Sequence, residues 1–146
     1  MAIQDPLTEQ IIGAAYRVAK SLGYGFLEKV YENALAHELG KTGLKTEQQH
    51  AIKVHYDGVI VGDFVADLLV EERVIVELKA VRAIDDIHVA QALNYLKATR
   101  LPTCLLINFG KSGVELRRFG LDRTQDTPAP GPMAPEDCAP QQDTSP

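Results

Sequence analysis

The chain has 146 residues, of which 20 are acidic and 15 are lysine or arginine, and its formal net charge is −5. This length suits one compact domain that buries about two-thirds of the surface its unfolded form exposes. The two cysteines form no C-x-x-C pair and no apolar run approaches membrane-spanning length, which excludes a four-cysteine metal site within one chain and predicts a cytoplasmic protein without a membrane segment.

The segment 121–146 differs from the rest of the chain. It is rich in proline, poor in apolar side chains and without periodicity, so it cannot bury enough surface to offset the entropy lost on ordering. It holds five acids and one base, which leaves the remainder close to neutral and without the basic stripe of a tight non-specific DNA binder. We expect a folded domain over 1–120 and a disordered, acidic, proline-rich tail over 121–146.

Two helices are predicted at the start of the chain. Asp5 is a suitable N-cap and Pro6 a suitable first helical residue, and apolar residues then recur at helical spacing as far as Leu22. Glycines at 23 and 25 end this helix. A second helix is predicted from about residue 26 to 40 or 41, with a buried stripe made of Phe26, Val30, Ala34 and Leu35.

Strand patterns follow. A weakly alternating segment at 51–56 and a long strand at 59–70 flank Asp57-Gly58, which is a strong hairpin signal. The turn at 71–73 leads into an apolar run at 74–81, which is typical of a strand covered on both faces.

The last predicted elements are a helix and two strands. The helix spans about 87–98 behind the caps Asp85 and Asp86, and the strands span 103–108 and 114–119. The order is therefore two helices, three strands, one helix and two strands, which indicates an α/β fold.

The strand at 74–81 carries two charges in an otherwise apolar run. Because side chains alternate along a strand, Glu77 and Lys79 lie on one face together with Ile75. An ionised side chain is costly to bury unless it is paired or binds a metal ion. The alternative is an exposed pair on an edge strand, which the surrounding apolar residues disfavour.

The length of the turn decides whether Asp67 joins this pair. If residues 71–73 form a three-residue loop, Val70 pairs with Val74, and Asp67 lies opposite Glu77 on the same face. A two-residue loop would place the two acids on opposite faces.

Adjacent carboxylates repel each other unless a cation lies between them, and such oxygen ligands suit Mg²⁺ or Mn²⁺. Lys79 could orient or activate an attacking water and offset charge at a phosphate. The three side chains predict metal-assisted hydrolysis of phosphodiester bonds.

These motifs also resemble a known family. Asp67 followed by Glu77-Leu78-Lys79 in an apolar strand resembles the PD-(D/E)XK nuclease superfamily, and Gln91 and Tyr95, four apart on the next helix, resemble the motif of its RecB-like branch. The segment 25–31 resembles the signature that names the GxxExxY protein family within this superfamily.

The resemblance implies a restriction-endonuclease-like three-layer core, with a mixed β-sheet flanked by helices in the order ααβββαββ. It implies Mg²⁺ or Mn²⁺ ligands at Asp67 and Glu77, a catalytic lysine at Lys79, and a further ligand or water-positioning acid at Glu28. Family members often carry Val-His where this chain has Val18-Ala19, and Gly-Pro-Gly where it has 23–25.

Some assignments keep an alternative. Glu28 could be a solvated helix residue, and Tyr31 is better explained by core packing than by chemistry. Gln91 and Tyr95 would line the site and position the substrate or the lysine, or they could be helix–sheet contacts. The four histidines fit surface or capping positions better than metal sites.

The sequence thus predicts a metal-dependent nuclease acting on nucleic acid, with DNA as the favoured substrate and DNA repair or processing as its context. The alternative is a nuclease-fold module with little or no activity that binds nucleic acid or a protein partner. A homodimer that engages nucleic acid only when assembled is a third interpretation.

Overall fold

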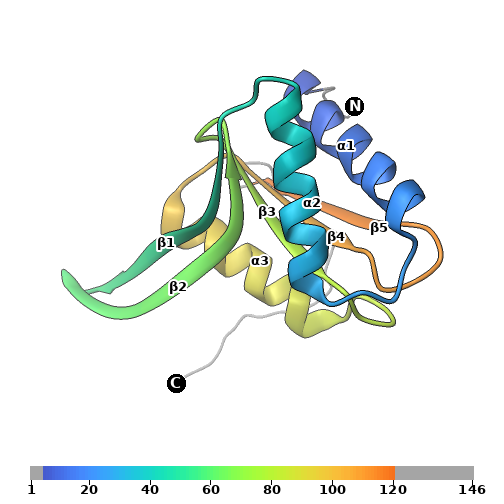
Figure 1. The fold of residues 1–146 in the computed structure, drawn as a ribbon. Coiled ribbons are helices and arrows are strands. Elements are labelled where there is room, and N and C mark those ends of the chain that lie inside the picture. Colours follow the sequence, from blue (N-terminus) through green and yellow to red (C-terminus); the bar gives the residue numbers. More distant parts are fainter. Residues whose placement is uncertain (1–4, 121–146) are drawn as a thin grey trace.

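The computed structural model describes residues 5–120, so the tail predicted at 121–146 lies outside the described part. Within residues 5–120 the elements follow the predicted order ααβββαββ (Figure 1). Their bounds are α1 (Pro6–Leu22), α2 (Glu28–Lys41), β1 (Thr46–Tyr56), β2 (Val59–Val70), β3 (Val74–Lys79), α3 (Asp86–Thr99), β4 (Thr103–Asn108) and β5 (Glu115–Gly120).

The strands form one sheet in the order β1-β2-β3-β4-β5. The pairing of β3 with β4 is parallel and the other pairings are antiparallel, so the sheet is mixed. Helices α1 and α2 cover one face and α3 covers the other (Figure 1). This three-layer arrangement confirms the predicted restriction-endonuclease-like α/β architecture.

The centre of the sheet is buried on both sides because β3 and β4 are mainly apolar. Val76 and Leu78 pack toward α1 and α2, whereas Ile75 packs toward α3 together with Leu106 of β4. The predicted alternation of faces along β3 is therefore confirmed, and it places Glu77 on the α3 side.

The second helix begins later than predicted. Leu27 is extended, with φ −69° and ψ 153°, and α2 starts at Glu28. Its buried stripe consequently follows Tyr31, Leu35 and Leu39, and the prediction that Phe26 and Val30 are buried is wrong, since they are 49% and 37% exposed.

Tyr31 is a core residue, as the packing interpretation predicted. Its ring is fully buried and stacks on Phe109 with centroids 4.7 Å apart. Its hydroxyl donates to the Gly23 carbonyl at 2.7 Å and accepts from the Phe26 backbone N–H at 3.2 Å. The tyrosine therefore fixes the connection between α1 and α2 and sets where α2 begins.

Strand β1 starts at Thr46, five residues before the predicted start at 51. The added residues are polar, so apolar alternation could not reveal them, and pairing with β2 defines them instead. The turn at Asp57-Gly58 is confirmed, with φ of 55° and 77°, as the favoured two-residue hairpin requires.

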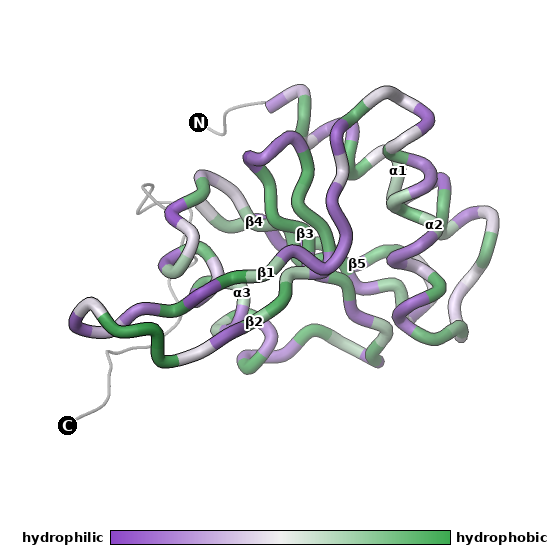
Figure 2. Tube along the Cα trace, turned by 60° about the vertical axis from the view of Figure 1, so that its left-hand side comes forward, coloured by the Kyte–Doolittle hydropathy of each residue, from purple (hydrophilic) through white to green (hydrophobic). Residues whose placement is uncertain are grey.

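The outer part of this hairpin, residues 53–65, projects beyond the rest of the sheet, and we call it the arm (Figures 1 and 2). Ile52 and Ala66, just inside it, are buried. The arm exposes large apolar side chains on its outer portion, namely Tyr56, Val59, Ile60, Val61, Phe64 and Val65.

The chain beyond β4 is locked against the end of β3. The Asn108 side-chain oxygen accepts from the backbone N–H groups of Val81 at 3.0 Å and Gly110 at 2.9 Å. A Cβ added at Gly110 would lie 2.1 Å from the Val81 carbonyl oxygen. This close approach fixes the backbone two residues after Lys79.

We expect Gly110→Ala to lower the free energy of unfolding by about 3 kcal/mol, because the clash is with backbone atoms that cannot rotate away. Gly40→Ala is the matched control, since nothing lies within 4 Å of its added Cβ. In helix α2 this change should raise stability by roughly 0.5–1 kcal/mol. Urea denaturation measures both, and equal effects would contradict the close approach.

Candidate active site

The predicted three-residue turn places Asp67 beside Glu77. Val70 pairs with Val74, and Leu68 pairs with Val76. Past Leu68 and Val76, side-chain carboxylates accept the hydrogen bonds in place of backbone carbonyls. The Asp67 backbone N–H donates to Glu77 Oε2 at 3.1 Å, and the Leu78 backbone N–H donates to Asp67 Oδ2 at 2.8 Å. Each carboxylate is thus held by the backbone of the opposite strand.

Strand β2 is irregular at this residue on both edges. Its pairing with β3 ends at Leu68, and its pairing with β1 passes over Asp67 and Gln49. Gln49 has φ 56°, a left-handed conformation that interrupts the ladder locally, although the register is the same on both sides of it. Toward the hairpin turn at 57–58, β2 bends away from β3 (Figure 1), and Asp67 is the first residue of β2 on that side of the paired segment 68–70. The two carboxylates therefore lie where the sheet opens.

Burial makes these carboxylates hard to ionise. Glu77 is 5% exposed, and desolvation, together with the neighbouring charge of Asp67, raises its pKa to about 8. Desolvation also raises the pKa of Asp67, although the hydrogen bond from Leu78 opposes the shift. Burial next to both acids raises the pKa of Tyr95 to about 12. A cation between the carboxylates would relieve this penalty.

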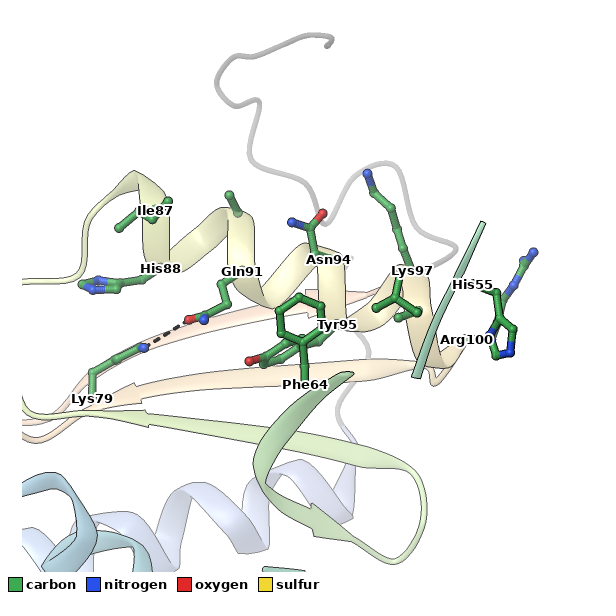
Figure 3. A pocket seen from close by; sticks show the side chains of 13 residues that line it. His55, Phe64, Lys79, Ile87, His88, Gln91, Asn94, Tyr95, Lys97 and Arg100 are labelled. Atoms are coloured by element: carbon green, nitrogen blue, oxygen red, sulfur yellow. Dashed lines mark hydrogen bonds between the residues drawn. The ribbon is translucent and has the colours of Figure 1, made fainter. Parts of the chain in front are cut away.

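Lys79 lies on the same side of the sheet and contacts α3. Its ammonium group donates to Gln91 Oε1 at 3.1 Å (Figure 3). Tyr95, one turn later, is 6% exposed, and its ring lies 6.0 Å from that of Phe64. Lys79, Gln91 and Tyr95 all line one cavity of about 920 Å³. The two helix residues therefore contact the sheet and line this cavity.

Glu28 approaches the pair from α2. It is exposed in the first turn of the helix, and its negative charge contributes to the raised pKa values of Asp67 and Glu77. Within residues 5–120, no three His, Cys, Asp or Glu side chains are grouped closely enough to hold a metal ion. The structure thus brings together Asp67, Glu77 and Lys79, and Glu28 is not grouped with them closely enough to share a metal ion.

Sequence reasoning missed Glu32. This side chain is 4% exposed, and it accepts from Gln48 Nε2 at 2.7 Å and Gln49 Nε2 at 2.9 Å. It therefore ties α2 to the irregular part of β1 opposite Asp67. One signal was available, since Glu32 lies four residues after Glu28 and so shares its side of the helix.

The histidines agree with their predicted ordinary roles. His88 completes the N-terminal cap of α3, where its Nδ1 accepts from the Asp85 backbone N–H at 3.1 Å. His50 pairs with Glu47 at the surface.

The donor set fits a hard divalent cation. Asp67 and Glu77 offer carboxylate oxygens with raised pKa values at the opening of the sheet, and Mg²⁺ is typically bound by one or two carboxylates plus water and substrate oxygens. When bound, such an ion polarises a phosphoryl oxygen and lowers the pKa of a water.

A mixed sheet covered by helices on both faces, with two acids and a lysine gathered where two strands diverge, defines a nuclease-type α/β domain. The comparison with protein families agrees, because a model described as the PD-(D/E)XK nuclease superfamily matches residues 5–119. The chain belongs to this superfamily. No curated protein and no solved structure matches it. None of the helices between residues 5 and 120 is long and apolar enough to cross a membrane.

Proposed function

We propose that the protein is a Mg²⁺- or Mn²⁺-dependent nuclease that hydrolyses phosphodiester bonds of nucleic acid, with DNA as the favoured substrate. The observation that supports this most is the crossed pair of hydrogen bonds between Asp67 and the β3 backbone and between Glu77 and the β2 backbone. It holds the buried carboxylate of Glu77 beside the half-buried one of Asp67 at a cost to stability, which a bound cation would offset.

Each side chain has a role in this proposal. Asp67 and Glu77 would hold the cation, which would supply positive charge to stabilise the phosphate in the transition state. Lys79 offsets the negative charge that develops on the phosphate and orients the attacking water, and its bond to Gln91 Oε1 fixes the ammonium group. Glu28, exposed at the start of α2, would be a further ligand of the cation or an acid that positions water.

The finer assignments belong to the same proposal. The signature at 25–31 supports placement in the GxxExxY family, and the free, buried thiol of Cys104 is compatible with a reducing cytoplasm. DNA repair or processing is the proposed context. The intact acid, acid and lysine positions support a nuclease over an inactive binding module. The exposed apolar outer part of the arm supports a homodimer.

The experiment incubates the full chain with linear, circular and single-stranded DNA and with RNA, in Mg²⁺, Mn²⁺ or EDTA. We expect cleavage in either metal, with DNA preferred, and none in EDTA. Light scattering on the same samples gives the molar mass of the active species. Cleavage that persists in EDTA, or none of any substrate at any metal concentration, would contradict the proposal.

A further inference from the structure

The cavity beside Lys79 extends along α3 to the end of that helix. It lies between the arm and α3 (Figure 3), with Lys79 and Gln91 at one end and His55, Lys97 and Arg100 at the other. Its volume of about 920 Å³ is at the upper end of the range for a small-ligand site. The cavity is therefore a groove that leads toward the proposed reaction centre.

The charge of this groove differs from that of the chain. Its lining includes Lys79, Lys97 and Arg100 together with His55 and His88, and no acidic residue. Over the described residues, Lys97 and Arg100 form no ion pair, and both are exposed. A cationic groove in a chain of net charge −5 concentrates an anionic ligand locally.

The groove also carries aromatic rings. Phe64 of the arm is 46% exposed, and its ring lies 6.0 Å from that of Tyr95 on α3, tilted by 55°. Apolar and amide side chains extend the wall, with Ile87 69% exposed and Asn94 exposed. Aromatic faces beside a row of cations are the features that bind unpaired nucleotides.

We propose that this groove binds a short unpaired strand of nucleic acid. Lys97 and Arg100 contact its phosphates, a base stacks on Phe64, and the strand runs toward Lys79. Both walls come from the protein, so a base must face the aromatic side chains, whereas in a duplex that face is stacked on the next base pair. Binding of the strand does not depend on the proposed function, and only its cleavage beside Lys79 rests on that function.

The test measures binding without cleavage. Fluorescence anisotropy follows a labelled strand of about 12 nucleotides, within the usual site size, and the duplex of the same sequence, both in EDTA with the full chain. We expect the unpaired strand to bind at least about tenfold more tightly. Phe64→Leu should weaken strand binding roughly tenfold, while Phe64→Tyr, which keeps the ring, should restore it.

Charge variants test the other contact. Lys97→Ala and Arg100→Ala should each lower the slope of log affinity against log salt by about one, as expected for a lost phosphate contact. Lys20→Ala is the matched control, because Lys20 is exposed on α1, across the sheet from the groove.

The outcomes separate the two proposals. Strand binding that depends on Phe64, Lys97 and Arg100, without cleavage in metal, would overturn the nuclease and leave the groove standing. Cleavage with binding unaffected by these three changes would overturn the groove alone. Duplex binding that equals or exceeds strand binding would also overturn the groove proposal. So would a parent chain that is a dimer and binds no strand, if the variant Ile60→Lys breaks the dimer and only then binds the strand.

Discussion

An Asp67→Asn variant is expected to lose metal-dependent cleavage by about 1,000-fold or more, which corresponds to about 4 kcal/mol of transition-state stabilisation. The asparagine oxygen can still accept the hydrogen bond that Leu78 donates to Asp67 Oδ2 at 2.8 Å. The variant therefore keeps the strand geometry and removes one of the two negative charges that would hold the cation. Initial rates in Mg²⁺ and Mn²⁺ measure the loss.

Asp63→Asn is the matched control. Asp63 lies four residues earlier on the same strand, is exposed and pairs with Lys53 at 2.7 Å, so the same substitution should leave cleavage within about twofold, as is usual at a surface position. Lys79→Met should approach the loss of Asp67→Asn, since it removes the ammonium charge. An Asp67→Asn protein with more than a tenth of the parent rate would mean that the cation is held elsewhere.

From the sequence, the register of the site depended on one open question, the length of the turn at 71–73. Side chains on a strand alternate with a period of two, so a three-residue turn at 71–73 leaves one arrangement of Asp67 and Glu77. The structure has this turn, with Glu71 and Glu72 at φ 53° and 56°. The turn length, which the sequence left open, therefore decides the contact between two residues on different strands.

Other features depend on contacts that no local pattern carries. The inner part of β1 is polar and becomes a strand because Val70, Leu69 and Leu68 of β2 pair with it. From its position in the sequence alone, Glu32 is predicted to be a surface residue of the helix, and only the fold brings Gln48 and Gln49 of β1 into contact with it. The groove likewise forms only when the arm lies over α3.

The stability of the protein should depend on pH through Glu77. Its pKa is about 4.5 when exposed and about 8 when folded, so between these values the folded state binds a proton that the unfolded state has released. The free energy of unfolding therefore falls as pH rises from about 5 to 8 and levels off above 8. The raised pKa of Asp67 acts in the same direction.

Glu77→Gln removes the cost of burying an ionised carboxylate, and its amide oxygen can still accept the hydrogen bond from the Asp67 backbone N–H. We expect it to raise the free energy of unfolding by about 2 kcal/mol or more at pH 8 and by little near pH 5, while cleavage is lost, as is common where a site is built at the expense of stability. Urea denaturation between pH 5 and 8 measures the difference between the variant and the parent chain.

Glu38→Gln serves as the control of opposite sign. Hydrogen bonds from Arg17 and Lys41 lower the pKa of Glu38, so its charge favours the folded state and the amide should bring no gain in stability at pH 8.

MgCl₂ should stabilise the parent chain more at pH 8 than at pH 5, because the cation favours ionised Asp67 and Glu77. MgCl₂ should change the free energy of unfolding of Glu77→Gln very little. If MgCl₂ stabilised the parent chain equally at pH 5 and pH 8, that result would contradict a buried, protonated Glu77.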